Sequence, residues 1–356
     1  MGKNTKRVMV GGVPLGGGAP VSVQSMTNTD TRDIEATVAQ ILALESAGCD
    51  IVRASVYDKE CASAFARIRP RIHIPLVADI HFDYRLAILA MENGADKIRF
   101  NPGNIGSEQN VRALVSCAKA HRVPIRVGVN AGSLEKDVLD RFGGPTPEAM
   151  LESALKHVRL LEGEGFFEIV LSLKASNVQD TVKAYRLASK EVDYPLHLGV
   201  TEAGRSLSGI VKSSVGIGAL LLDGIGDTIR VSLTGDPVKE VEAGLWILRA
   251  AGVDKGGVEI ISCPTCGRCR VDLESAVERV ERALPKNGPK IKVAVMGCAV
   301  NGPGEAKEAD IGIAFGPENA VVFRCGEKAY AGKMPEILDR FVQDAVELAA
   351  SRKDNL

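Results

Sequence analysis

The sequence has 356 residues, enough for two domains, and its 45% hydrophobic and 25% charged composition is ordinary for a soluble globular protein. A net charge of −1 argues against a large nucleic-acid-binding surface, and no apolar run is long enough to span a membrane. Eight cysteines are too sparse for a disulfide scaffold and no secretory signal is recognisable, so we expect a cytoplasmic protein with reduced thiols.

Residues 1–251 repeat one pattern, a short β-branched run followed by an amphipathic segment. Segments such as 34–47, 110–120 and 147–163 have the periodicity of helices. Strands that alternate with helices pair in parallel, and eight such units predict a (β/α)8 barrel, with an open doubly wound sheet as the alternative. The predicted strands are residues 21–24, 50–54, 75–78, 97–100, 124–129, 167–173, 195–200 and 228–233.

The glycine-rich stretch 11–18 precedes the first predicted strand. It lacks the spacing of a dinucleotide-binding loop, so we expect a hairpin turn across the bottom of the barrel. The eighth unit closes with a predicted helix at 238–251, and residues 252–257 are a predicted linker.

Residues 258–356 are predicted to form a smaller α+β domain. Its predicted strands are 258–261, 291–295, 311–315 and 320–323, and its predicted helices are 272–284 and 335–350. The cysteines of this region lie in turns next to strands.

Basic residues mark the ends of the predicted barrel strands, the face that carries the active site in such barrels. A single arginine at a strand end is more often half exposed and paired to a carboxylate than functional. Five cations aimed at one mouth predict an anionic substrate, a phosphate or diphosphate, because guanidinium forks match phosphate oxygens. These cations are Arg53, Arg99, Arg126, Lys174 and Arg230.

Carboxylates, amides and a histidine occur among those cations: Asp79, His81, Asn101, Asn130 and Glu202. They could orient substrate hydroxyls or carry protons, and nearby positive charge would lower the pKa values of the carboxylates. They could equally just balance the arginines, and His81 could be a structural histidine.

Cys263 and Cys266, with the distant Cys298, can close on one metal centre. Zinc would need a fourth ligand with the usual paired spacing, and no histidine follows His197, which favours a [4Fe–4S] cluster. The fourth ligand is either Cys269, which extends the pair to C-x-x-C-x-x-C, or Glu305 after a Gly-Pro-Gly turn. The other cysteines, Cys49, Cys61, Cys117 and Cys325, are expected to be spectators.

Three motifs together resemble the 4-hydroxy-3-methylbut-2-en-1-yl diphosphate synthases of the methylerythritol phosphate route to isoprenoids, and the likeness covers nearly the whole chain. The motifs are Ser-Cys-Pro-Thr-Cys-Gly-Arg at 262–268, Met-Gly-Cys-Ala-Val-Asn-Gly-Pro-Gly-Glu at 296–305 and Lys-Ile-Arg-Phe-Asn-Pro-Gly-Asn at 97–104. The length resembles the bacterial two-domain form.

The resemblance implies a (β/α)8 barrel followed by a cluster domain like those of sulfite and nitrite reductases. It implies reductive opening of 2-C-methylerythritol 2,4-cyclodiphosphate, with reduced flavodoxin or ferredoxin as the electron donor. It implies Cys263, Cys266, Cys298 and Glu305 as cluster ligands and leaves Cys269 outside the set.

By the same resemblance the diphosphate is bound by Arg53, Arg99, Arg126 and Lys174. Asp79, Asn101, Asn130 and Glu202 would face the carbon skeleton, and Glu202 is expected to handle protons. His81 matches a polar position of the same mouth.

The last barrel helix returns the chain to the end opposite the mouth, about 20 Å away, and a six-residue linker spans at most about 20 Å. The cluster domain would therefore struggle to reach its own barrel mouth. We expect a homodimer in which each subunit lends its cluster domain to the other.

Two other functions fit parts of the sequence. One is a phosphosugar lyase or aldolase that uses Lys174 as a Schiff-base amine beside a structural zinc domain. The other is an electron carrier or metal-storage protein with the barrel as scaffold.

Overall fold

The computed structural model describes residues 4–81, 83–101, 107–253, 256–269, 271–285 and 290–353. The chain divides into two compact units, Met1–Asp254 and Lys255–Leu356. The division falls within the predicted linker, and the finer domain boundaries stay a prediction. Residues 102–104, the end of the third motif, lie outside the described residues.

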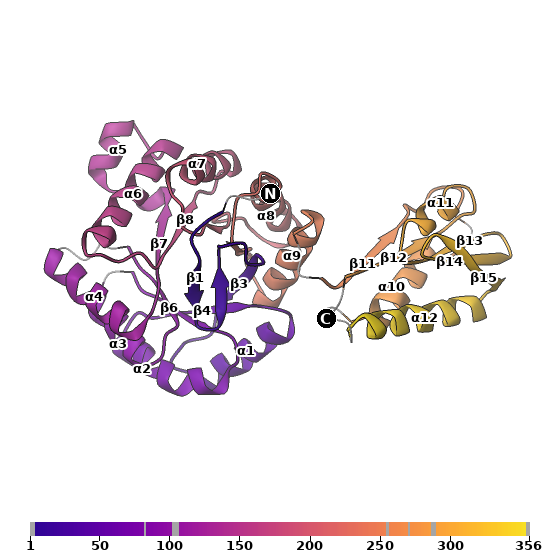
Figure 1. Cartoon of the computed structure of the whole chain (residues 1–356), viewed down its shortest axis with the longest axis horizontal. Coiled ribbons are helices and arrows are strands. Elements are labelled where there is room, and N and C mark those ends of the chain that lie inside the picture. The colour runs from indigo at the N-terminus through magenta and orange to yellow at the C-terminus, as the bar shows by residue number, and fades with distance from the viewer. Residues whose placement is uncertain are drawn as a thin grey trace. The chain divides into compact units, whose positions relative to one another are not determined.

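The first unit is a parallel eight-stranded barrel, which confirms the predicted fold class (Figure 1). The strand order is β8-β7-β6-β5-β4-β3-β10-β9, and a parallel bridge between Leu171 and Leu196 joins the two ends. All eight predicted strands are present, shifted by up to a few residues. They are β3 (Ser22–Met26), β4 (Ile51–Ser55), β5 (Leu76–Asp79), β6 (Lys97–Arg99), β7 (Ile125–Asn130), β8 (Ile169–Lys174), β9 (His197–Leu198) and β10 (Thr228–Ile229).

Helices surround the barrel because each strand leads into an amphipathic segment. Most begin with a side-chain cap, as where Asp33 accepts from the backbone N–H of Ala36 at the start of α1. The helices are α1 (Ile34–Ser46), α2 (Lys59–Ile68), α3 (Tyr84–Glu92), α4 (Glu108–His121), α5 (Lys136–Phe142), α6 (Pro147–Gly163), α7 (Val178–Glu191), α8 (Ser206–Leu222) and α9 (Pro237–Ala250).

The N-terminal hairpin closes the bottom of the barrel, as the glycine-rich stretch predicted. Strands β1 (Val8–Val10) and β2 (Val13–Leu15) pair antiparallel, and Gly11 in the turn has a φ of 53°. Val8, Val10 and Leu15 pack against Ile51 and Val170 of the barrel strands. The opposite end of the strands is therefore the open mouth.

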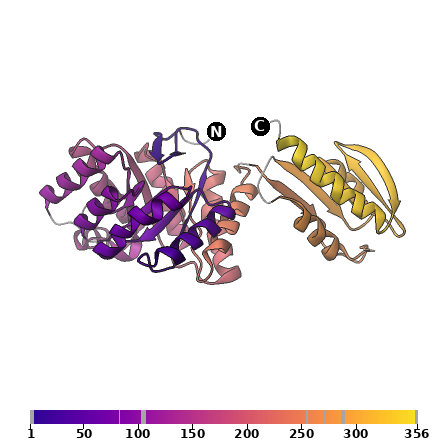
Figure 2. The same ribbon diagram turned by 90° about the horizontal axis from the view of Figure 1, so that it is seen from below.

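The second unit is a five-stranded mixed sheet of order β11-β12-β13-β14-β15. Its strands are β11 (Val258–Ser262), β12 (Ile291–Met296), β13 (Ile311–Phe315), β14 (Asn319–Arg324) and β15 (Glu327–Lys333). Helices α10 (Leu273–Ala283) and α12 (Glu336–Lys353) share one apolar core with the sheet (Figure 2). The short helix α11 (Gly302–Lys307) packs in a separate apolar cluster with Met296, Ala314 and Phe323.

Two elements of this unit were not predicted. Strand β15 is largely exposed and reads Glu-Lys-Ala-Tyr-Ala-Gly-Lys, with no β-branched residue. Helix α11 begins Gly-Pro-Gly, which is typical of a turn. No helix among the described residues is both long and apolar enough to cross a membrane.

Candidate functional site

Polar side chains from the carboxyl ends of the barrel strands enclose a small cavity of about 120 Å³ at the mouth. Every barrel residue predicted from the sequence lines it except Asn101 and Glu202. The lining is Arg53, Asp79, His81, Arg99, Arg126, Gly128, Asn130, Ser172, Lys174, Thr201, Arg230 and Ser232.

Asp79 is the carboxylate at the centre of this lining. Its Oδ2 lies 3.8 Å from Arg53 Nε, and its Oδ1 lies 3.7 Å from Arg99 Nε. Burial raises the pKa of Asp79, but the positive charges of Arg53 and Arg99 outweigh burial and hold it below its usual value. Oδ1 accepts no hydrogen bond from the described residues, so the ionised carboxylate keeps an acceptor for a substrate hydroxyl.

Three further cations lie in this lining: Arg126 and Lys174 are buried, and Arg230 is partly buried, 3.7 Å from Glu240. Burial and the neighbouring arginines lower the pKa values of Arg126 and Lys174 well below their ordinary values, and burial brings that of Arg230 to about 10. Within the described part of the chain, Arg126 Nε and Nη2 and Arg230 Nε have no hydrogen-bond partner. Buried donors without acceptors favour binding of an anion.

Two glycines make room for these cations. A Cβ on Gly128 would lie 3.0 Å from Arg99 Nε, and one on Gly199 would lie 2.9 Å from Lys174 Nζ. A side chain at either position would force the neighbouring cation to shift.

The two predicted residues outside the lining have different surroundings. Asn101 is buried, and its Oδ1 accepts a hydrogen bond of 2.9 Å from the backbone N–H of Gly128. Glu202 is exposed on the loop after β9, with a left-handed φ of 52°, next to Thr201 of the lining. Asn101 thus holds the backbone of a lining residue in place, whereas Glu202 is exposed to solvent.

Sequence reasoning missed Gly128, Ser172, Thr201 and Ser232 as lining residues. Three of them lie two positions from a predicted cation or amide on the same strand or its extension, so they face the same way. The alternation of strand side chains could have identified them. Small hydroxyl residues gave no other signal in the sequence.

Cysteines of the second unit lie where two neighbouring strands of its sheet end. Cys263 follows β11 and Cys298 follows β12, and these strands pair in parallel. The backbone N–H of Gly297 donates to Cys263 Sγ at 3.2 Å. Backbone N–H groups of Arg268 and of Val300 lower the thiol pKa values of Cys266 and Cys298, respectively, which favours the thiolates that metal binding requires.

The two candidates for a fourth ligand differ in their surroundings. Cys269 Sγ lies 3.3 Å from the carbonyl oxygen of Val271, and a Cβ on Gly297 would come within 2.6 Å of that sulfur. Glu305 lies in α11, close behind Cys298, on an exposed position. Among the described residues, no three cysteine, histidine or acidic side chains are placed to hold a single metal ion.

Cys325 is exposed between β14 and β15, and the other three remaining cysteines lie in the first unit. Burial raises the pKa of Cys49 to about 12 and also raises those of Cys61 and Cys117. The thiols of Cys49, Cys61 and Cys117 are therefore protonated at neutral pH and are poor metal ligands.

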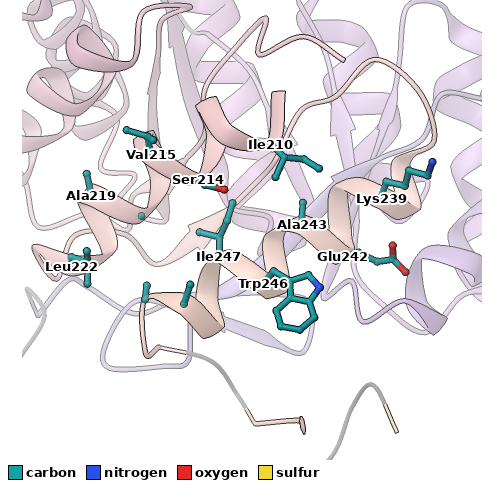
Figure 3. A pocket seen from close by; sticks show the side chains of 13 residues that line it. Ile210, Ser214, Val215, Ala219, Leu222, Lys239, Glu242, Ala243, Trp246 and Ile247 are labelled. Carbon is teal, nitrogen blue, oxygen red and sulfur yellow. The ribbon is translucent and has the colours of Figure 1, made fainter. Parts of the chain in front are cut away.

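An apolar groove of about 860 Å³ lies between α8 and α9 on the outside of the barrel (Figure 3). Ile210, Val215, Leu222 and Trp246 line it. Leu222 is 75% exposed and Trp246 is 52% exposed, which is unusual for side chains of this size.

Comparisons with known proteins agree with both units. The family model described as GcpE TIM-barrel domain matches residues 5–245, and that described as GcpE protein C-terminal domain matches residues 259–347. A dihydropteroate synthase of Yersinia pestis has a similar fold, with a TM-score of 0.50 and 12% identity over 69% of this chain and 98% of that structure.

Curated relatives are similar over nearly their whole length. One from Caldanaerobacter subterraneus subsp. tengcongensis is 58% identical over 97% of both chains, and one from Clostridium perfringens is 55% identical over 96% of this chain and 98% of that protein. Both are named 4-hydroxy-3-methylbut-2-en-1-yl diphosphate synthase (flavodoxin).

Proposed function

The chain belongs to the GcpE family, and from this premise we propose how its residues perform the family's reaction. It is an iron–sulfur oxidoreductase of isoprenoid precursor synthesis that converts 2-C-methyl-D-erythritol 2,4-cyclodiphosphate into (E)-4-hydroxy-3-methylbut-2-enyl diphosphate. Two electrons and two protons enter, the ring opens and one water leaves. The observation that carries our assignment of the site is the set of buried cations with unpartnered N–H groups at the barrel mouth.

The cations bind the diphosphate. Arg126 and Arg230 offer unpartnered N–H donors, and Lys174 lines the same cavity. Arg53 donates to Met26 Sδ and Arg99 donates to the carbonyl oxygen of Gly128. Each lies nearly 4 Å from Asp79, too far for a hydrogen bond, so their remaining N–H groups can bind phosphate oxygens.

The uncharged and acidic groups bind the carbon skeleton. Asp79 accepts a hydrogen bond from a substrate hydroxyl through its unpartnered Oδ1, and Asn130 and His81 line the same cavity. Asn101 holds the Gly128 backbone in place. Glu202 is the proton-handling acid, because its exposed carboxyl group can exchange protons with water at the rim.

The second unit holds a [4Fe–4S] cluster through Cys263, Cys266, Cys298 and Glu305. Thiols whose pKa values are lowered by backbone N–H groups, in turns at one sheet edge, fit such a group. When bound, the cluster supplies single electrons. The donor is reduced flavodoxin or ferredoxin, and reduced thiols support a cytoplasmic location.

Two substitutions test the ligand set. Glu305→Ala is expected to reduce iron and sulfide content and alter the electron paramagnetic resonance spectrum, whereas Cys269→Ser should leave both unchanged. The reverse result would replace Glu305 by Cys269 as the fourth ligand.

The active unit is a homodimer with sites shared between subunits. Helix α9 runs from the mouth to the opposite end of the barrel, so the chain leaves the barrel away from its own substrate site. The exposed groove between α8 and α9 supplies an apolar face for a second copy.

Mixing subunits tests the shared site. A Cys298→Ser subunit and an Arg126→Ala subunit are each expected to be inactive, and mixed dimers should regain activity. Mixed dimers that form and stay inactive would show that each subunit works alone.

Anaerobic turnover tests the function as a whole. The purified protein with reduced flavodoxin is expected to convert the cyclic diphosphate into the allylic diphosphate. Membership of this family argues against the two alternative functions, an aldolase and an electron carrier, that fitted parts of the sequence.

A further inference from the structure

A fully buried lysine lies below the mouth, where it lines no part of the cavity. Lys97 is 0% exposed on β6, two residues before Arg99. Its Nζ donates a 3.2 Å hydrogen bond to Gln24 Oε1 of β3. Because β6 and β3 are separated by two strands in the sheet, this bond crosses the barrel interior.

Lys97 lies beside Val77, an apolar residue of β5, but other buried side chains of the barrel strands are polar, whereas the interior layers of such barrels usually consist of branched apolar side chains. The Nδ1 atom of His197 lies 3.3 Å from Thr228 Oγ1, and both residues are fully buried. Gln24 Nε2 and His197 Nε2 find no hydrogen-bond partner among the described residues. The barrel therefore keeps polar groups where apolar ones would be more stable.

Positive charge dominates this interior. Glu240 approaches Arg230 at 3.7 Å and Asp79 lies between two arginines, but in the described part of the chain no carboxylate forms an ion pair with Lys97. Taken strand by strand, the titratable and charged groups are Arg53 (β4), Asp79 (β5), His81 (after β5), Lys97 and Arg99 (β6), Arg126 (β7), Lys174 (β8), His197 (β9), Arg230 (after β10) and Glu240 (α9).

Protonation of Lys97 in the empty barrel is opposed by burial first and then by the charges of Arg126 and Arg53, which together hold its pKa well below the ordinary value. A bound cyclic diphosphate changes this balance, because each of its phosphorus atoms carries an ionised oxygen. Those charges would face Arg53 and Arg126 and offset their repulsion of an ammonium beneath them.

We propose that Lys97 is a charge-compensating residue of the substrate site, neutral in the empty barrel and protonated when the diphosphate binds. The proposal rests on the proposed function for the ligand class. Lys97 does not touch the substrate. It is a positioning residue, because its change of charge acts on the cations that bind the diphosphate. Binding then takes up a proton from solvent, and the Kd rises by up to about tenfold per pH unit where Lys97 titrates.

Calorimetric titration tests this with the cluster-loaded protein under anaerobic conditions and without reductant, so that no turnover occurs. The cyclic diphosphate is added at several pH values between 6.5 and 9.5, in pairs of buffers with different ionisation enthalpies. The difference in heat gives the number of protons taken up per ligand bound. Wild-type protein is expected to take up protons over part of this range.

Lys97→Met should remove up to one proton of this uptake and flatten the pH dependence of Kd. Lys97→Gln, which keeps a donor for Gln24, is a second variant with the same expected result. Lys183→Met, on the exposed surface of α7, is the matched control and should behave as wild type.

Three results overturn the inference or its premise. Equal proton uptake by wild type and both Lys97 variants would assign the proton elsewhere, with Lys174 the next group to test. No uptake by wild type at any pH would show that the charge of Lys97 does not change. Absence of any binding to wild type would instead contradict the proposed function.

Discussion

Replacing Arg126 by methionine should stabilise the barrel while it weakens substrate binding. The Arg126 side chain is 2% exposed, and its Nε and Nη2 donate no hydrogen bond to any described residue. Each unsatisfied buried donor costs about 1–3 kcal/mol, so a methionine of similar length is expected to raise the free energy of unfolding by about 2 kcal/mol. Two charged hydrogen bonds to phosphate are worth roughly 3 kcal/mol or more, so the Kd should rise at least about a hundredfold.

The chain offers a local probe for the first half of this prediction. Trp246 is the single tryptophan and lies on α9, so its fluorescence during urea unfolding reports the barrel unit at a fixed protein concentration. Calorimetry with the cyclic diphosphate measures the second half. Arg186→Met, at an exposed ion pair with Asp223, is the control and should change either quantity by less than about 0.5 kcal/mol.

The two effects of Arg126→Met must have opposite signs. A fall in the free energy of unfolding together with weaker binding would show that Arg126 stabilises the fold through partners other than substrate. Unchanged binding would remove Arg126 from the diphosphate site.

Three other predictions follow from particular contacts. Gly297→Ala should lose the iron–sulfur absorption, because the new Cβ would lie 2.6 Å from Cys269 Sγ. Adding Cys269→Ala should restore the absorption, and failure of the double variant to do so would mean that this clash is not the cause. Asp79→Asn should lower the free energy of unfolding at pH 7. The difference from wild type should shrink as pH falls below about 4, because a carboxyl group whose pKa is lowered on folding stabilises the fold only while it is ionised. A constant difference across pH 3–7 in urea unfolding would contradict this. Trp246→Glu should convert the proposed dimer to monomer in analytical ultracentrifugation, and a variant that stays dimeric would exclude the α8–α9 groove as the interface.

Most of the barrel could be predicted from the sequence because its signals are local. Most strands lie in short β-branched runs, most helices begin at a capping residue, and the arginines lie at the strand ends. Strand β15 and helix α11 were missed for the converse reason. Pairing with β14 and packing against Met296 hold them in place, and neither contact appears in their own composition.

The residue types of the candidate site could be predicted from the sequence, but the burial of each side chain could not. Lys97 and Arg99 look alike in the motif at 97–104, yet one is buried in the barrel centre and the other lines the mouth. Ser172 and Thr201 gave no signal because small hydroxyl residues are common everywhere. Glu202 was predicted from its place after a strand, yet it is exposed and does not line the cavity.

The central claim, reductive ring opening of a cyclic diphosphate, is tested most directly by phosphorus NMR of a single anaerobic reaction. Cluster-loaded protein, reduced flavodoxin and the cyclic diphosphate are combined, and the product is identified by its mass. The signals of the cyclic diphosphate should disappear as those of a linear allylic diphosphate grow, one product for every two electrons consumed. Persistence of the cyclic diphosphate in the presence of a fully loaded, reducible cluster would contradict the account.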